Sequence, residues 1–231
     1  ANGGFRYALV IVDVWSRLVV AEAMQDKYGS TVLEAWKTIL SELPPGTQPR
    51  ILDTDVGPEF LGVFTEHLRR TGVLHIQKDP RQKDAIAVVD SAIGRLKQAI
   101  SKELADTGGE RWVDALPRAV DALNDRPHPH LYGAAPNDTD SNPNLRRLLD
   151  ANAGFDILEN SKQTRATETQ LQEAGAFRVL LPKREWPRAD QARYSSQVYK
   201  VASVRAGYVT DTAGVRTQVR FALPVPGTSA N

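Results

Sequence analysis

The chain of 231 residues is long enough for one large domain, or for a medium-sized domain followed by a small one. Its apolar fraction of 41% and charged fraction of 25% are typical of a globular chain, and no apolar run approaches the ~18 residues of a membrane span. The sequence contains no cysteine, which excludes disulfides and thiolate metal sites and favours an intracellular protein.

The net charge of +1 hides an uneven distribution. Residues 1–160 contain 18 Lys and Arg against 23 Asp and Glu, whereas residues 161–231 contain 11 against 5. A basic C-terminal part joined to a more acidic part favours a polyanionic partner that one part binds and the other processes. An ordinary charged tail would give the same balance, so charge alone leaves both interpretations open.

The first elements form a strand pair and a helix. Residues Tyr7–Val12 are a near-continuous apolar run that ends at Asp13, which predicts a buried strand with an acid at its end. Residues 18–24 form the second strand of a tight hairpin. Apolar residues then recur at helical spacing over residues 30–43, with Ser30 as the N-cap, until a Pro-Pro-Gly sequence ends the helix.

The middle of the chain alternates short strands and helices. Residues 50–54 and 73–77 read as strands, and residues 59–71 read as a helix that ends at Gly72. Residues 78–84 are charged and aperiodic, which predicts a loop. Two further helices follow at 90–106 and 112–124, the second with an internal proline, and residues 125–145 are expected to be irregular. This order is typical of an α/β mixed sheet.

Three acids stand at the ends or starts of these elements. Asp13 and Asp55 each follow a strand, and Asp90 opens a helix. If they converge, the cluster needs a cation to stay ionised, and oxygen ligands alone suit a hard ion such as Mg²⁺. Alternatives remain open: Asp53 lies on the same strand as Asp55, and an aspartate at a helix start is ordinarily an N-cap.

The C-terminal part differs in kind. Residues 161–175 are polar, and we expect the linker between domains there. Four β-prone runs follow, at residues 176–181, 197–206, 208–210 and 218–223, separated by turns. These runs predict a small barrel of about five strands over residues 176–225.

Five segments, taken in order, resemble the integrases of retroviruses, LTR retrotransposons and Maverick/Polinton elements. YALVIVDVWSRLVVAEAM resembles their first-acid segment, DTDVGPEF their T-D-N-G-x-E-F segment, and AVVDSAIGRLKQAI their third-acid helix. NDRPHPHLYGAAP is similar to their N-x-R-P-H segment, and residues 175–224 resemble the SH3-like barrel that follows the core. Each motif alone is weak, but five in the family's order cover nearly the whole chain.

The resemblance implies an α/β ribonuclease H-like core, a mixed sheet flanked by helices, over residues 1–160, followed by a small all-β SH3-like barrel. It maps the catalytic and metal-binding triad onto Asp13, Asp55 and Asp90, with two Mg²⁺ or Mn²⁺ ions as cofactors. The implied activity is that of a DNA integrase, a polynucleotidyl transferase that processes DNA 3′ ends and joins them to target DNA, with an endonuclease step. Two ions would activate a water or a 3′-hydroxyl and stabilise the leaving oxygen.

The sequence departs from the family pattern at three points. The third acid is Asp90 where the family has Glu, with 34 residues between it and Asp55. Val56 replaces the asparagine after the second acid, and the family's N-terminal zinc domain is absent. Because the sequence starts directly before the first strand, we expect it to be a processed form or a fragment.

Basic residues supply the expected DNA contacts. Arg95 and Lys97 lie on the Asp90 helix, where they are either its solvated face or phosphate ligands. Lys183, Arg184 and Arg188 in the barrel segment are expected to bind DNA. With no cysteine to complete a zinc set, His67 and His75 are expected to be structural. For His128 and His130, in a proline-rich loop, a DNA-backbone role and no role are both open.

Two rival functions share parts of this pattern. A catalytically inactive, domesticated integrase that acts as a DNA- or protein-binding module is favoured by Asp90 and Val56. A hybrid-cleaving ribonuclease H shares the core, but the basic barrel argues against it. The integrase interpretation implies DNA as partner, a homo-oligomer, no membrane association and a nuclear location.

Overall fold

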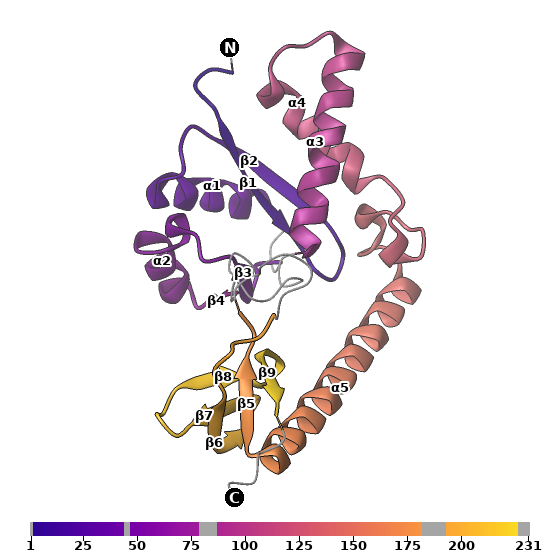
Figure 1. The fold of residues 1–231 in the computed structure, drawn as a ribbon. Helices are drawn as coiled ribbons and strands as arrows, with labels where there is room; N and C mark the ends of the chain where they lie inside the picture. Colours follow the sequence, from indigo (N-terminus) through magenta and orange to yellow (C-terminus); the bar gives the residue numbers. More distant parts are fainter. Residues whose placement is uncertain (1, 44–46, 79–86, 182–192, 226–231) are drawn as a thin grey trace, which may run out of the picture. The chain divides into compact units, whose positions relative to one another are not determined.

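The computed structural model describes residues 2–43, 47–78, 87–181 and 193–225 (Figure 1). The chain divides into two compact units, Ala1–Leu149 and Asp150–Asn231, and each is considered by itself. The first unit contains β1 (Tyr7–Val12), β2 (Val19–Met24), α1 (Gly29–Glu42), β3 (Ile51–Thr54), the short 3₁₀ helix η1 (Pro58–Phe60), α2 (Val63–Thr71), β4 (Leu74–Gln77), α3 (Ala87–Thr107), α4 (Trp112–Asn124), η2 (Pro129–Leu131) and η3 (Pro136–Asp138).

The β1–β2 hairpin is the layer to which the helices of the first unit are attached. Its strands are antiparallel, with Leu9 opposite Glu22 and Ile11 opposite Val20. Side chains alternate between the two faces of a strand, so one hairpin face meets α1 and α2 and the other meets α3 and α4. Figure 1 shows these two helix pairs on opposite sides of the hairpin. This double coverage explains why Tyr7–Val12 is almost wholly apolar.

The two hairpin faces carry side chains of different size. The face toward α1 and α2 presents Leu9, Ile11 and Met24 to a core that includes Trp36 and Phe64, whose rings meet edge to face at 5.9 Å. The opposite face presents smaller side chains to α3 and α4, namely Ala8, Val10, Ala21 and Ala23. The smaller residues allow α3 and α4 to approach the sheet closely.

The expected single mixed sheet is divided in the described residues. β1 pairs with β2, and β3 pairs in parallel with β4 as a second two-stranded sheet, with Ile51 opposite Leu74 and Thr54 opposite Gln77. Leu52 of β3 nevertheless packs into the same core as Ile11 of β1. The second sheet therefore joins the first through apolar side chains.

Three helix starts differ from the sequence-based expectation. Ser30 is not the N-cap of α1, because the helix starts one residue earlier and Tyr28 stands at that position without a side-chain cap. The helix expected at 59–71 is broken, since Gly62 has φ 58° and separates η1 from α2. α3 begins at Ala87, so Asp90 lies in its first turn. Gly72 ends α2 in the left-handed conformation, as expected.

α4 spans the predicted residues, and its last residue is hydrogen-bonded to the hairpin. The side chain of buried Asn124 accepts a hydrogen bond from the Val19 N–H at 2.9 Å and donates one to the Val19 carbonyl at 2.8 Å. Both polar groups at the start of β2 are thereby satisfied by one amide side chain.

The segment expected to be the interdomain linker is helical. α5 (Pro143–Ala174) begins in the first unit, where Leu145 and Leu149 pack with Leu131, and its remaining residues belong to the second unit. Residues 161–174 form its last turns, and Gly175 follows with φ 64°. Across the described residues, no helix is both long and apolar enough to cross a bilayer.

The second unit contains a five-stranded antiparallel sheet in the order β8-β7-β6-β5-β9. Its strands are β5 (Ala176–Val179), β6 (Tyr199–Arg205), β7 (Tyr208–Asp211), β8 (Arg216–Gln218) and β9 (Ala222–Pro224), with the 3₁₀ helix η5 (Val219–Phe221) before the last. Its core joins Leu171 of α5 to Phe177, Val209, Val219 and Ala222. The expected number of strands is thus found.

Candidate functional site

In the turn after β1, the carboxylate of Asp13 accepts hydrogen bonds from residues of the same turn. One carboxylate oxygen accepts hydrogen bonds from the Ser16 N–H, at 2.8 Å, and from the Ser16 hydroxyl. The backbone of Asp13 closes the same turn, because its N–H donates to Leu18 and its carbonyl accepts from Arg17. Asp13 therefore acts as an Asx-type turn residue, with donors already on its acceptor atoms.

The turn after β3 leaves the carboxylate of Asp55 available. The Asp55 side chain is exposed, and no donor among the described residues lies within hydrogen-bonding distance of it. A Cβ atom built on Gly57 would lie 3.2 Å from Asp55 Oδ1 and 2.6 Å from Glu59 Oε2. Two carboxylates thus converge above a glycine, in a space that any larger residue would fill.

The structure also separates Asp55 from its rival on the same strand. Asp53 forms an ion pair with Lys78, with 2.8 Å between Oδ2 and Nζ. A carboxylate already paired with an ammonium group is a poorer ligand for a further cation. This arrangement favours Asp55, as the sequence did.

A hydrogen-bonded chain holds the backbone of this turn. Buried Thr54 donates its hydroxyl proton to the Asp55 carbonyl at 2.9 Å, so the same oxygen must accept from His75 Nε2 at 2.9 Å. Burial lowers the pKa of His75, and Asp53 opposes this shift. The contacts of His75 with Thr54 and, at 3.4 Å, with Thr65 agree with the structural role expected for it.

The predicted convergence of the three acids is not found. Asp90 is exposed in the first turn of α3, and Asp13 is engaged in its own turn. Among the described residues, no group of three or more His, Asp or Glu side chains could hold one metal ion. The strands that precede the first two acids, β1 and β3, belong to separate two-stranded sheets among the described residues, although both pack into one core. The donor chemistry suits Mg²⁺, but the geometry does not complete a site.

The basic residues predicted to contact DNA have different surroundings. Lys97 is exposed on α3, whereas Arg95 is half-buried, and its Nε is removed from solvent without an acceptor among the described residues. Lys183, Arg184 and Arg188 lie outside the described residues.

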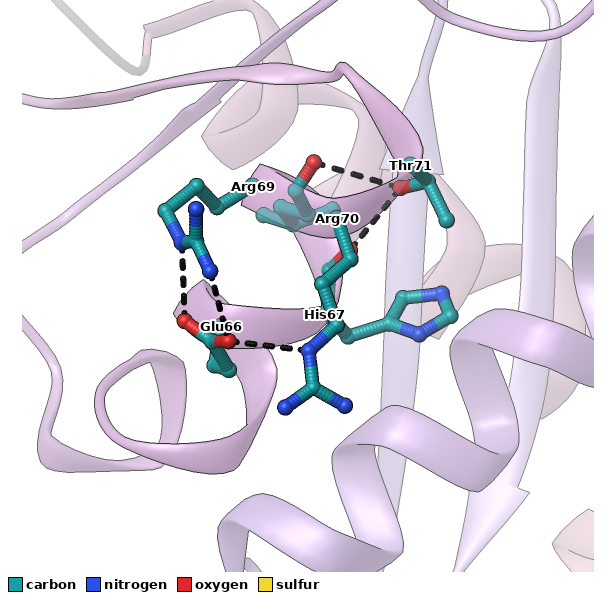
Figure 2. Close-up of polar contacts among 6 residues, drawn as sticks. Glu66, His67, Arg69, Arg70 and Thr71 are labelled. Carbon is teal, nitrogen blue, oxygen red and sulfur yellow. Dashed lines mark hydrogen bonds and ion pairs between the residues drawn. The ribbon is translucent and has the colours of Figure 1, made fainter.

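On α2, by contrast, one carboxylate forms ion pairs with two arginines. Figure 2 shows Glu66 between Arg69 and Arg70, with nitrogen–oxygen distances of 2.8–2.9 Å. Hydrogen bonds from Arg69 and Arg70 lower the pKa of Glu66 to about 2. In the same view, His67 contributes its backbone carbonyl to the Thr71 hydroxyl, a structural contact.

Sequence reasoning missed Arg17. This residue has φ 61°, a left-handed conformation that is uncommon for a residue with a side chain. Its Nε is also buried without an acceptor among the described residues. The available signal was its place at the end of a four-residue hairpin turn, where Gly or Asn would be usual.

Comparison with known proteins shows what the first unit resembles. Residues 1–83 match the family model of the integrase core domain. A transposon-derived protein of Caenorhabditis elegans is 27% identical over 123 residues, which cover 53% of this chain and 42% of that protein. The Gag-Pol polyprotein of Koala retrovirus is 33% identical over 138 residues, covering 58% of this chain and 8% of the polyprotein. The chain thus matches less than half the length of either relative.

A solved structure extends the likeness of fold over most of the chain. The integrase assembly of simian T-cell lymphotropic virus, solved as an intasome with the PP2A regulatory subunit B56 gamma, has a TM-score of 0.64 at 16% identity. The likeness covers 97% of this chain and 73% of that chain. At this identity the likeness concerns the fold, and it supports the ribonuclease H-like core that the sequence predicted. The first part of the chain therefore resembles the integrase core domain, and retroviral and transposon-derived proteins share this likeness over a longer stretch.

Proposed function

We propose that this chain is the integrase of a mobile genetic element and that it joins DNA 3′ ends to target DNA at a site centred on Asp55. The observation that carries the proposal is the pair of carboxylates, Asp55 and Glu59, converging over Gly57 within an integrase core. Asp55 is exposed and has no donor within hydrogen-bonding distance among the described residues.

The proposal restricts the ligand role to Asp55 and Asp90. Asp13, the first acid of the implied triad, accepts two hydrogen bonds from Ser16 on Oδ2, so this oxygen is already engaged in closing the turn. Mg²⁺ or Mn²⁺, as two ions, would supply the charge that polarises the phosphate and activates the attacking oxygen. The described side chains alone do not complete a set of ligands for such an ion.

The residues of the chain supply positioning and charge. Thr54 and His75 fix the Asp55 backbone, and Lys97 presents an exposed ammonium group on the helix that carries Asp90. Backbone phosphates are the expected partners of such cations. We also propose that the second unit is an SH3-like barrel that binds DNA through Lys183, Arg184 and Arg188, that the protein acts as a homo-oligomer, and that it works in the nucleus.

Strand transfer with a labelled duplex and Mg²⁺ or Mn²⁺ tests the proposal. Asp55→Asn keeps the shape of the side chain and removes its charge, so product should fall to the background level while the fold is retained. Asp53→Asn is the matched control: it makes the same change two residues away, at a carboxylate that Lys78 already neutralises. Full activity of Asp55→Asn would refute the assignment.

A second function is favoured by one observation, the lack of a complete metal-ligand group among the described residues. Val56, in place of the family's asparagine, agrees with it. In that case the chain is an inactive integrase that binds DNA or protein. Wild-type protein that binds duplex DNA but yields no strand-transfer product with either metal would establish this alternative.

A further inference from the structure

Three elements converge beside the turn of the β1–β2 hairpin. Asn124, at the end of α4, is hydrogen-bonded to Val19, two residues past Arg17. Trp15 of the turn packs against a cluster that contains Leu131, which lies close in sequence to His128. The turn, the end of α4 and the segment after α4 are therefore neighbours.

α3 brings a second arginine to the same place. Leu96 of α3 belongs to the cluster against which Ala8 and Val10 of β1 pack, and Arg95 precedes it. Arg17 and Arg95 are both half-buried, and the Nε of each is removed from solvent with no acceptor in the described part of the chain. Among the described residues, neither arginine lies within ion-pair distance of a carboxylate. Buried N–H groups are nearly always paired in native proteins, so these donors point to a missing acceptor.

The electrostatic effects agree with a shared cationic site. Burial lowers the pKa of Arg17, Asp13 opposes this shift, and Arg95 adds to it. Burial also lowers the pKa of His128, and Arg95, Arg17 and His130 lower it further. Cations that destabilise one another at short range are stabilised together by an anion.

His128 adds a donor without needing a charge. Its Nδ1 accepts a hydrogen bond from the His130 backbone N–H at 3.1 Å. In the neutral ring the proton therefore lies on Nε2, which can donate to an anion.

Three other arginines of the first unit are ion-paired with carboxylates. Glu66 pairs with both Arg69 and Arg70 (Figure 2), and Glu103 pairs with Arg118. The left-handed backbone of Arg17 also supports a functional role, because an arginine occupies a position where glycine would be less strained.

We propose that Arg17, Arg95 and His128 form a binding site for a backbone phosphate of duplex DNA. Two planar guanidinium groups match the geometry of a phosphodiester, and the site contacts no base, so it positions DNA without reading its sequence. The nearby Asp13 carboxylate is engaged by Ser16 and offsets part of the charge. This inference rests on the proposed function, because it takes DNA as the polyanion.

The test is a titration of the full chain with a labelled duplex of each of two unrelated sequences, at salt concentrations from about 50 to 300 mM. Arg17→Gly removes the guanidinium and suits the backbone at φ 61°, Arg95→Gln removes the second cation, and His128→Gln removes the imidazole. Each arginine variant should reduce the slope of log affinity against log salt by about one and weaken both sequences equally. The variant that lacks both arginines should lose less binding free energy than the sum of the two single losses, since both arginines bind one phosphate.

Matched controls and a rescue variant separate this site from a general effect of charge. Arg70→Ala and Arg118→Ala each remove an arginine that is already ion-paired with a carboxylate, so their salt slopes should stay near that of the parent. Arg17→Lys keeps the charge and should retain most of the slope. Thermal melting of each variant establishes that it is folded.

The outcomes are distinguishable. If the parent binds DNA and transfers strands while Arg17→Gly and Arg95→Gln keep its salt slope, the phosphate site is refuted and the integrase proposal stands. If the parent binds no duplex at any salt concentration, both the phosphate site and the integrase proposal are refuted. Slopes reduced as much in the two controls as in the site variants also overturn the proposal.

Discussion

Asp13 and Asp55 each stand one residue beyond a strand, yet the turns that follow treat the two carboxylates differently. After β1, the chain continues with Ser16, whose N–H and hydroxyl both bind Asp13. After β3, the chain continues with Gly57 and Glu59, which place a second carboxylate near Asp55 and no donor. An acid after a strand is therefore an ambiguous signal. The residues that follow decide whether it closes a turn or remains available for chemistry.

The largest effect should distinguish the two acids directly. Asp13→Asn keeps an oxygen for the Ser16 donors, so we expect strand transfer to persist, whereas Asp55→Asn should abolish it. The measurement is the initial rate of strand transfer for each variant, at equal concentrations of folded protein. If Asp13→Asn were as inactive as Asp55→Asn, Asp13 would be a ligand and the contrast between the two turns would fail.

The next effect concerns the glycine between the carboxylates. In Gly57→Ala the new methyl group would lie 2.6 Å from Glu59 Oε2, so that flexible side chain must move and Asp55 must adjust. We expect activity to fall on the order of 10- to 100-fold with little change in stability. Gly154→Ala in α5, where nothing lies within 4 Å, is the control and should leave activity unchanged. Loss of stability without loss of activity would contradict the prediction.

A smaller effect is expected at the other turn. Ser16→Ala removes the hydroxyl that donates to Asp13 and accepts from the Leu18 N–H, and should reduce the free energy of unfolding by about 1–2 kcal/mol. Urea unfolding of the full chain measures it. Ser41→Ala, which removes an exposed hydroxyl contact in α1, should change stability by less than about 0.5 kcal/mol. Equal losses in the two variants would show that the Asp13 turn needs no hydroxyl.

The smallest effect is a pH dependence of stability, which arises from His75 beside the Asp55 turn. The pKa of His75 is lowered in the folded state, so the unfolded chain binds the proton more readily. The stability that His75 contributes is complete above about pH 6.5, its unfolded pKa, and declines as pH falls toward the folded value. His75→Gln should therefore lose less in melting temperature than the parent between about pH 7.5 and 5. Because the pKa of His128 is also lowered, the melting temperatures of both the parent and His75→Gln should still depend on pH to some extent.

The sequence predicted elements well where local pattern and tertiary burial agree. The apolar run Tyr7–Val12 and the amphipathic helix Trp112–Asn124 are found at the predicted residues. The helical state of the expected linker was not predicted: the polar residues 161–174 form a helix whose Leu171 packs into the sheet of the second unit. No local pattern reveals that a single leucine anchors a polar segment.

The site was predicted in part for a similar reason. Asp55 could be chosen over Asp53 from the Gly-Pro that follows it, and the ion pair of Asp53 with Lys78 agrees with that choice. The convergence of three acids depends on how β1 and β3 are joined, which the strand patterns do not encode. Arg17 was missed because its significance lies in a backbone angle and a buried nitrogen, neither of which is visible in the letters.

The two hydrogen bonds between Asn124 and Val19 also bear on the order of folding. They join residues 105 positions apart, whereas the hairpin itself can form from neighbouring residues. Contacts across such a separation carry a large entropy of loop closure and tend to form late. During synthesis, the start of β2 lacks these partners until α4 has emerged from the ribosome. The turn with Asp13 and Arg17 should therefore reach its final form only after more than half of the chain exists.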